Sequence, residues 1–140
     1  PGTSAAQERG LGFNQVIWEH SQMIVVARET AHFDRKSAQE TMLRLLQTGV
    51  DFDAVFAHND NMILGALEAM ESVGYTPPPV LIGFDAIREA VRAVEQGKLT
   101  ATIAQRPERM GRLAIRSAAR ILRGEQLPSE IPVELELIEK

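Results

Sequence analysis

Cysteine is absent from this sequence of 140 residues, which excludes disulfide bonds, thiolate nucleophiles and zinc sites built on thiolates. The three histidines, His20, His32 and His58, lie far apart with no carboxylate at ligand spacing, so we expect no metal site. The glycine patterns that cradle phosphates are missing, as is a Ser/His/Asp arrangement. We therefore expect neither an enzyme nor a bound cofactor.

Long apolar runs and an excess of basic residues are also missing. No run approaches the roughly 20 apolar residues that cross a bilayer, so we expect no membrane-spanning segment. Lysine and arginine number 15 against 19 acidic residues, and the net charge of −4 disfavours binding to nucleic acid, which needs a net basic face. A phospho-receiver or enzyme with Asp85 or Asp60 as nucleophile is a second function class. The few lysines, however, do not assemble a receiver site around either aspartate.

The length is that of one compact domain. The chain starts at Pro1 without an initiator Met, so we expect a processed or truncated N-terminus.

The segment from Asp53 to Gly74 constrains the fold most. Its first residues, 54–57, are uniformly apolar, as in a strand buried on both faces of a parallel sheet. A helix follows, with apolar residues at helical spacing until Gly74. His58, Asn59 and Asp60 lie between the two, at the carboxyl end of the strand, where ligands bind in open α/β sheets. Helix capping is the alternative role for Asn59 or Asp60.

Similar alternation continues along the chain. We predict further strands at 23–27, 80–83, 99–105 and 133–138, and further helices at 5–20, 37–48, 87–95 and 107–123, with a proline-rich turn at 75–79 and a linker at 126–132. Short apolar strands alternating with helices indicate a mostly parallel sheet with helices on both faces. The expected fold is a single three-layer α/β domain over 1–140.

Polar and aromatic side chains follow several predicted strands and are expected to meet at one rim of the sheet. The candidates are Phe33, Asn59, Phe84, Asp85 and Gln105, joined by Arg9 from the first helix. Carboxylate, amide and guanidinium groups hydrogen-bond adjacent hydroxyls, and aromatic rings cover the apolar faces of a sugar. The set suits a neutral polyol. Helix capping by Asp85 and core packing by Phe33 are the alternatives, while Phe84 reads as an exposed ring.

The motifs GTSAAQERGLGF, AHFDR, DAVFAHNDNMILGALEAM, IGFD and GKLTATIAQRPERMG resemble, in order and spacing, the type I periplasmic sugar-binding proteins of ABC importers, most closely those for ribose. The resemblance implies a periplasmic-binding-protein lobe with a flavodoxin-like sheet. It also implies a non-catalytic role in binding a ribose-like pentose, a membrane permease as partner and a periplasmic or extracytoplasmic location. The six residues named above match the family's sugar contacts. The effector domain of a sugar-responsive repressor, and a truncated or designed folding unit without ligand function, are the alternatives.

Members of that family are about twice as long, so the resemblance implies that this chain is their C-terminal portion. The segment missing by comparison includes most of the first lobe and the first strand of this one. The helix at 107–124 would then belong to the absent lobe. We expect its apolar stripe either to fold back onto this domain or to pack against a second copy of the chain. Alone, the chain is expected to bind sugar weakly.

Overall fold

The computed structural model describes residues 3–76 and 79–140. In chain order the elements are α1 (Ser4–Glu19), α2 (Arg35–Gln47), β1 (Ala54–Phe56), α3 (Asp60–Val73), β2 (Val80–Phe84), α4 (Arg88–Glu95), β3 (Ala101–Ala104), α5 (Pro107–Leu122) and β4 (Glu136–Glu139). Each of these elements was predicted to within a few residues. Part of the predicted turn at 75–79 lies outside the described residues. Within the described ranges, no helix is long and apolar enough to cross a membrane.

The sheet has the strand order β1-β2-β3-β4. The first three strands are parallel, and β4 runs antiparallel to β3. Crossovers between parallel strands are right-handed, and the connections β1–α3–β2 and β2–α4–β3 advance in the same direction across the sheet. The helices α3 and α4 therefore cover the same face. The mostly parallel sheet predicted from the sequence is confirmed.

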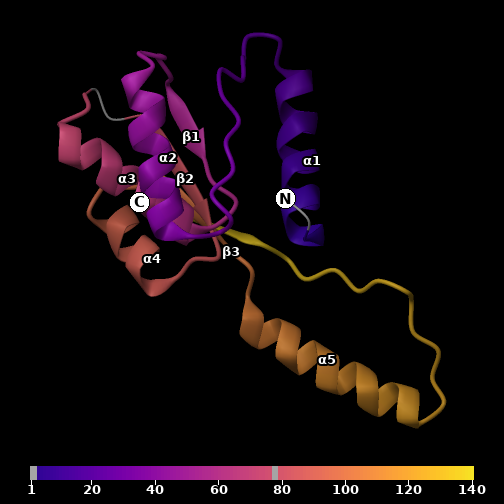
Figure 1. Cartoon of the computed structure of the whole chain (residues 1–140). Helices are drawn as coiled ribbons and strands as arrows, with labels where there is room; N and C mark the ends of the chain where they lie inside the picture. Colours follow the sequence, from indigo (N-terminus) through magenta and orange to yellow (C-terminus); the bar gives the residue numbers. More distant parts are fainter. Residues whose placement is uncertain (1–2, 77–78) are drawn as a thin grey trace.

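Strand alternation divides side chains between the two faces of the sheet. Val55 and Leu81 belong to the core beneath α3, while Phe56 points to the opposite face. There its ring stacks on Phe13 of α1, with centroids 5.6 Å apart and planes inclined by 6°. Helices therefore lie on both faces, as predicted, with α1 alone on its side (Figure 1).

The hydrophobic core lies between the sheet and the helices α2, α3 and α4. Its buried members include Met42, Ile63, Leu64, Met70, Leu81, Val94 and Leu99. The helices α2 and α3 pack at close range through Gly65, where an added Cβ would lie 2.2 Å from the backbone oxygen of Arg35. This close approach leaves no space for a side chain at that position.

The predicted strand at 23–27 is wrong. The segment is extended but belongs to no strand of the described chain, and Met23, Ile24 and Val26 are half or more exposed. An apolar pattern favours a strand only where a neighbour supplies the hydrogen-bond ladder, and none of the described strands lies beside this segment. For the same reason β1 is an edge strand, and Ala54 is exposed rather than buried on both faces.

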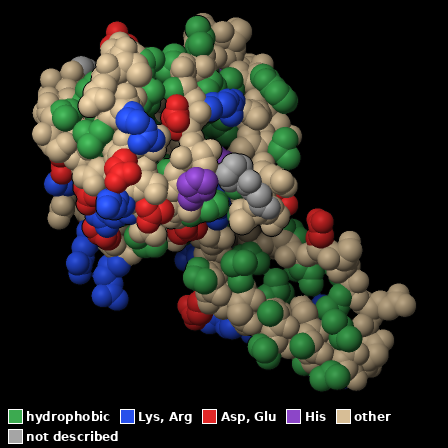
Figure 2. All heavy atoms as spheres, in the orientation of Figure 1, with side chains coloured by type: hydrophobic (Ala, Val, Ile, Leu, Met, Phe, Trp, Pro, Cys, Tyr) green, Lys and Arg blue, Asp and Glu red, His purple; other side chains and the backbone are tan. Residues whose placement is uncertain are grey.

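The helix α5 stands away from the rest of the molecule (Figure 1). It has no buried residue, and Ile115 and Leu122 are 74% and 88% exposed. Apolar side chains gather on the surface of this part of the molecule (Figure 2). The expectation that the helix folds back onto the sheet is therefore wrong in this structure. Packing against a second copy stays a prediction.

Candidate functional site

The candidate site lies at the carboxyl ends of β1, β2 and β3. Because these strands are parallel, the residues that follow them meet at one edge of the sheet. Asn59 follows β1, Asp85 follows β2 and Gln105 follows β3. The fold thus brings together three of the six predicted residues by topology alone.

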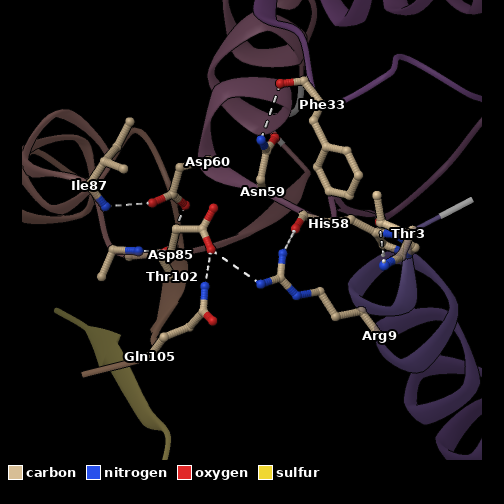
Figure 3. A network of polar contacts seen from close by, with 12 residues as sticks. Thr3, Arg9, Phe33, His58, Asn59, Asp60, Asp85, Ile87, Thr102 and Gln105 are labelled. Atoms are coloured by element: carbon tan, nitrogen blue, oxygen red, sulfur yellow. Dashed lines mark hydrogen bonds and ion pairs between the residues drawn. The ribbon is translucent and has the colours of Figure 1, made fainter. Parts of the chain in front are cut away.

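Asp85 is the centre of a polar network that spans three elements (Figure 3). The amide Nε2 of Gln105 donates a hydrogen bond to its Oδ1. Arg9, from α1, donates to the same oxygen through Nη2 at 3.3 Å, and through Nη1 to the backbone carbonyl of His58. Among the described residues, both partners of the Asp85 carboxylate use Oδ1, so Oδ2 is available to accept from a ligand hydroxyl.

Arg9 also covers the ring of Phe84. Its Cζ lies 3.8 Å from the ring centroid, a cation–π geometry. Phe84 is therefore only 8% exposed, which corrects the prediction of an exposed ring. The guanidinium group takes the place over the ring that a sugar face was expected to occupy.

Helix capping was the alternative role for both Asn59 and Asp85, and the structure shows it for Asn59 but not for Asp85. Asn59 is the N-cap of α3, because its Oδ1 accepts from the amide of Met62 at 2.9 Å. The helix α4 begins after Ile87 with no side-chain cap, so Asp85 does not cap it. The Asp85 carboxylate is 31% exposed and faces the rim, whereas Asn59 is 7% exposed.

Phe33 joins the site through Asn59. The side-chain nitrogen of Asn59, Nδ2, donates a hydrogen bond to the backbone carbonyl of Phe33 at 3.2 Å. His32 and Phe33 have φ values of 51° and 60°, in the left-handed region that side chains rarely adopt. The Phe33 ring is half-buried and extends toward Arg9 and His58 (Figure 3). Asn59 thus fixes the loop that carries Phe33.

His58 and Asp60, named first with Asn59 from the sequence, do not present side chains to the rim network. His58 contributes its carbonyl, and burial, followed by the positive charge of Arg9, lowers the pKa of its imidazole. Asp60 is fully buried, and burial raises the pKa of its carboxyl group. Sequence reasoning missed Thr102, which contacts Asp60 from β3. A threonine in an apolar strand carries no signal that separates this role from ordinary strand propensity.

Comparison with known sequences identifies the family. The model of the periplasmic binding protein domain matches residues 1–126. The ribose import binding protein RbsB of Escherichia coli is 43% identical over 139 residues, which are 99% of this chain and 46% of that protein. The protein of the same name from Bacillus subtilis is 44% identical over 137 residues, 98% of this chain and 44% of that protein. The chain therefore spans about half the length of the curated relatives it matches.

Solved structures agree with this match. An ABC transporter periplasmic solute binding protein from Actinobacillus succinogenes, with bound D-allose, has a TM-score of 0.92 at 28% identity, covering 99% of this chain and 50% of that one. A solute binding protein from Bacillus halodurans, with bound myo-inositol, has a TM-score of 0.86 at 36% identity, covering 99% and 48%. These likenesses confirm the lobe predicted from the sequence motifs. The chain belongs to the family of periplasmic binding protein domains.

Proposed function

We propose that the chain contributes one half of a binding site for a neutral, ribose-like pentose, and that the whole protein delivers this sugar to the permease of an ABC importer. The observation that carries the proposal is the convergence of Arg9, Asp85 and Gln105 from three separate elements. The charges of Arg9 and Asp85 offset each other, so the rim favours hydroxyl groups over an ionic ligand. On this proposal the chain catalyses no reaction and acts outside the cytoplasm.

The roles of the six predicted residues follow from their contacts. Asp85 would accept hydrogen bonds from sugar hydroxyls through Oδ2, while Arg9 and Gln105 would donate to hydroxyl oxygens. The Phe33 ring would lie against an apolar face of the sugar. Asn59 would donate its remaining Nδ2 hydrogen to the sugar and hold the loop that carries Phe33. Phe84 would support the guanidinium group of Arg9 through its ring.

The relatives favour a transport role over the repressor alternative. Those described above are named as import or solute-binding proteins, and the ligands bound in the two solved structures are D-allose and myo-inositol, both uncharged polyols. A folding unit without ligand function would leave the convergence at Asp85 without a purpose. We therefore retain ribose-like sugar binding as the function and D-ribose as the first ligand to test.

The test is an NMR titration of the isotope-labelled chain with D-ribose. A half-site open to water forms weaker hydrogen bonds than an enclosed one, so we expect a Kd on the order of millimolar, about −4 kcal/mol. The Gln105 side-chain amide and the Asp85 backbone amide should shift in a saturable way. Asp85→Asn should abolish these shifts.

Glu71→Gln is the matched control, because Glu71 is an exposed carboxylate whose partner is Lys98, away from the rim. This variant should titrate like the original chain. Absence of saturable shifts at the rim, or equal responses from the Asp85 and Glu71 variants, would refute the proposal.

A further inference from the structure

A fully buried carboxylate lies beneath the rim, in contact with the turn that carries Asp85. Asp60, the first residue of α3, is 0% exposed. Its Oδ2 accepts a hydrogen bond from the backbone amide of Ile87 at 2.8 Å, and its Oδ1 accepts from the hydroxyl of Thr102 at 2.7 Å. Asp60 is therefore bonded to the turn between β2 and α4 and to the adjacent strand β3.

Thr102 extends this contact to a second amide of the same turn. Its hydroxyl oxygen, which donates to Asp60, also accepts from the backbone amide of Ala86 at 3.2 Å. The two side chains thus bind two successive amides, those of Ala86 and Ile87. Among the described residues every buried side-chain nitrogen and oxygen has a partner, so this small network is complete.

The turn held in this way has an unfavourable backbone conformation. Asp85 has a φ of 110° and Ala86 a φ of 51°, both in the range that side chains rarely adopt. Residues in such conformations persist only where the surroundings fix them. Asp85 is further held by its own amide, which donates to the carbonyl of Ile103 at 2.8 Å. The unusual conformation directs the Asp85 carboxylate toward Arg9 and Gln105 (Figure 3).

Gly83 makes room for the buried carboxylate. A Cβ at this position would lie 2.2 Å from Oδ1 of Asp60 and 2.8 Å from Cγ2 of Ile63. Strand β2 therefore omits a side chain at the point where Asp60 reaches β3. Burial also raises the pKa of Asp60, against the effect of its hydrogen bonds with Thr102 and Ile87, so its charged form is costly in this place. A buried carboxylate that is hydrogen-bonded to a turn with positive φ values points to a role in holding that turn.

We propose that Asp60 and Thr102 are positioning residues of the sugar site: together they bind the amides of Ala86 and Ile87 and so hold the Asp85 carboxylate in register with Arg9 and Gln105. Both residues are fully buried, so their role is to position Asp85 and not to contact the ligand. The proposal rests on the proposed function for its binding readout, whereas its geometric readout, the state of the β2–α4 turn, does not depend on any ligand.

The experiment compares Thr102→Val, Thr102→Ser and Asp60→Asn by NMR on the full chain. Valine keeps the volume and removes the hydroxyl, so the amide of Ala86 should lose protection from hydrogen exchange and the Gln105 side-chain resonance should move. Affinity for D-ribose should fall about tenfold, the order expected when a buried hydrogen-bond network is broken. Serine keeps the hydroxyl and should restore both readouts. Asp60→Asn keeps the shape and should change the amide of Ile87 most.

Thr41→Val is the matched control, since Thr41 is a similarly buried threonine on α2 whose hydroxyl contacts Arg44 rather than the turn. It should leave the turn and the affinity unchanged. The proposal is overturned if Thr102→Val leaves the Ala86 and Gln105 signals as they were, or if Thr102→Ser fails to restore them. If the turn changes as expected but the original chain does not bind D-ribose, the positioning role stands and the proposed ligand falls. If Thr102→Val does not fold, the Ser and Asn variants decide the outcome by the same signals.

Discussion

The body of the molecule and its two outlying helices, α1 and α5, differ in how much of their surface is buried. The body consists of α2, α3, α4 and the sheet, and contains the buried core. In contrast, neither α1 nor α5 has a single buried residue. The single tryptophan, Trp18 on α1, is 77% exposed. Hydrophobic burial therefore holds the body together, while α1 is attached by a few specific contacts.

The candidate site draws on both regions. Asp85 and Asn59 belong to the body, Gln105 lies where the chain leaves it, and Arg9 comes from α1. The attachment of α1 is the ring stack of Phe13 on Phe56 together with the contacts of Arg9. Rigid and weakly attached parts thus share one site, which implies that ligand binding and the docking of α1 stabilise each other.

The largest effect is expected from Gly65→Ala, because this change places a Cβ against the backbone of the neighbouring helix α2. The added Cβ would lie 2.2 Å from the Arg35 carbonyl, so α2 and α3 must move apart. We expect a loss of about 3 kcal/mol in the free energy of unfolding, measured by urea denaturation. Gly111→Ala on α5 is the control. It meets no atom within 4 Å and should leave this transition unchanged or raise it slightly. Equal destabilisation by the two variants would contradict the proposed difference in packing between the body and α5.

A second comparison uses two stacked aromatic pairs of similar geometry. Phe13 stacks on Phe56 across the α1 contact, and Phe52 stacks on Tyr75 within the body at 5.3 Å. Phe52→Ala should lower the free energy of unfolding of the body by about 2–3 kcal/mol, a half-buried aromatic truncation. Phe13→Ala should leave that value within about 1 kcal/mol, because it removes a peripheral contact. Hydrogen exchange should then show lost protection in α1 only; a global loss for Phe13→Ala would contradict the picture.

The smallest effect concerns pH. Burial and Arg9 lower the pKa of His58 from its ordinary value of 6.5. Below that value the unfolded chain therefore binds the proton more readily than the folded one, and stability should fall as pH drops from about 7.5 to 5.5. Asp60, whose pKa is raised, acts in the opposite direction, since protonation favours its buried form. Comparing variants separates the two.

His58→Gln should remove the histidine component of this pH dependence. His20→Gln, at the exposed C-terminal end of α1, should retain it. Urea midpoints at the two pH values measure the difference. A pH dependence that is the same in the His58 variant would show that another group titrates.

The sequence predicted those features that depend on local pattern and on parallel topology. The convergence of Asn59, Asp85 and Gln105 follows from their positions after parallel strands. Arg9 was named from its place in the first helix, and the resemblance to the family then supported it. The roles of Asn59 and Asp85 could not be separated, because an Asn or Asp before a helix is equally suited to a cap and to a ligand. Only the observed start of α4 at Arg88 settles that Asp85 does not cap.

The predictions of a strand at residues 23–27 and of α5 folding back onto the sheet failed for the same reason, which is that neither segment has the expected packing neighbour in the described chain. Residues 23–27 have the composition of a strand, and α5 has an apolar stripe, but composition does not reveal what lies beside an element. Thr102 was missed for a related reason. Its hydroxyl matters because Asp60 and Ala86 lie across from it, and neither is near it in sequence.

The chain segment that contains α5 connects β3 to β4, and its two ends lie at neighbouring points of the sheet. Residue Ala104, the last of β3, is paired in register with Glu136, the first of β4. Arg106 and Glu136 also form an ion pair at this junction. Residues 107–135 can therefore be treated as a detachable insert that leaves Gln105 in place, because Ala104 and Glu136 at its two ends already lie on adjacent strands. Replacing the insert by a short hairpin turn would join β3 directly to β4 and shorten the loop to be closed on folding. The same junction is where an unrelated module could be grafted without disturbing the strand order.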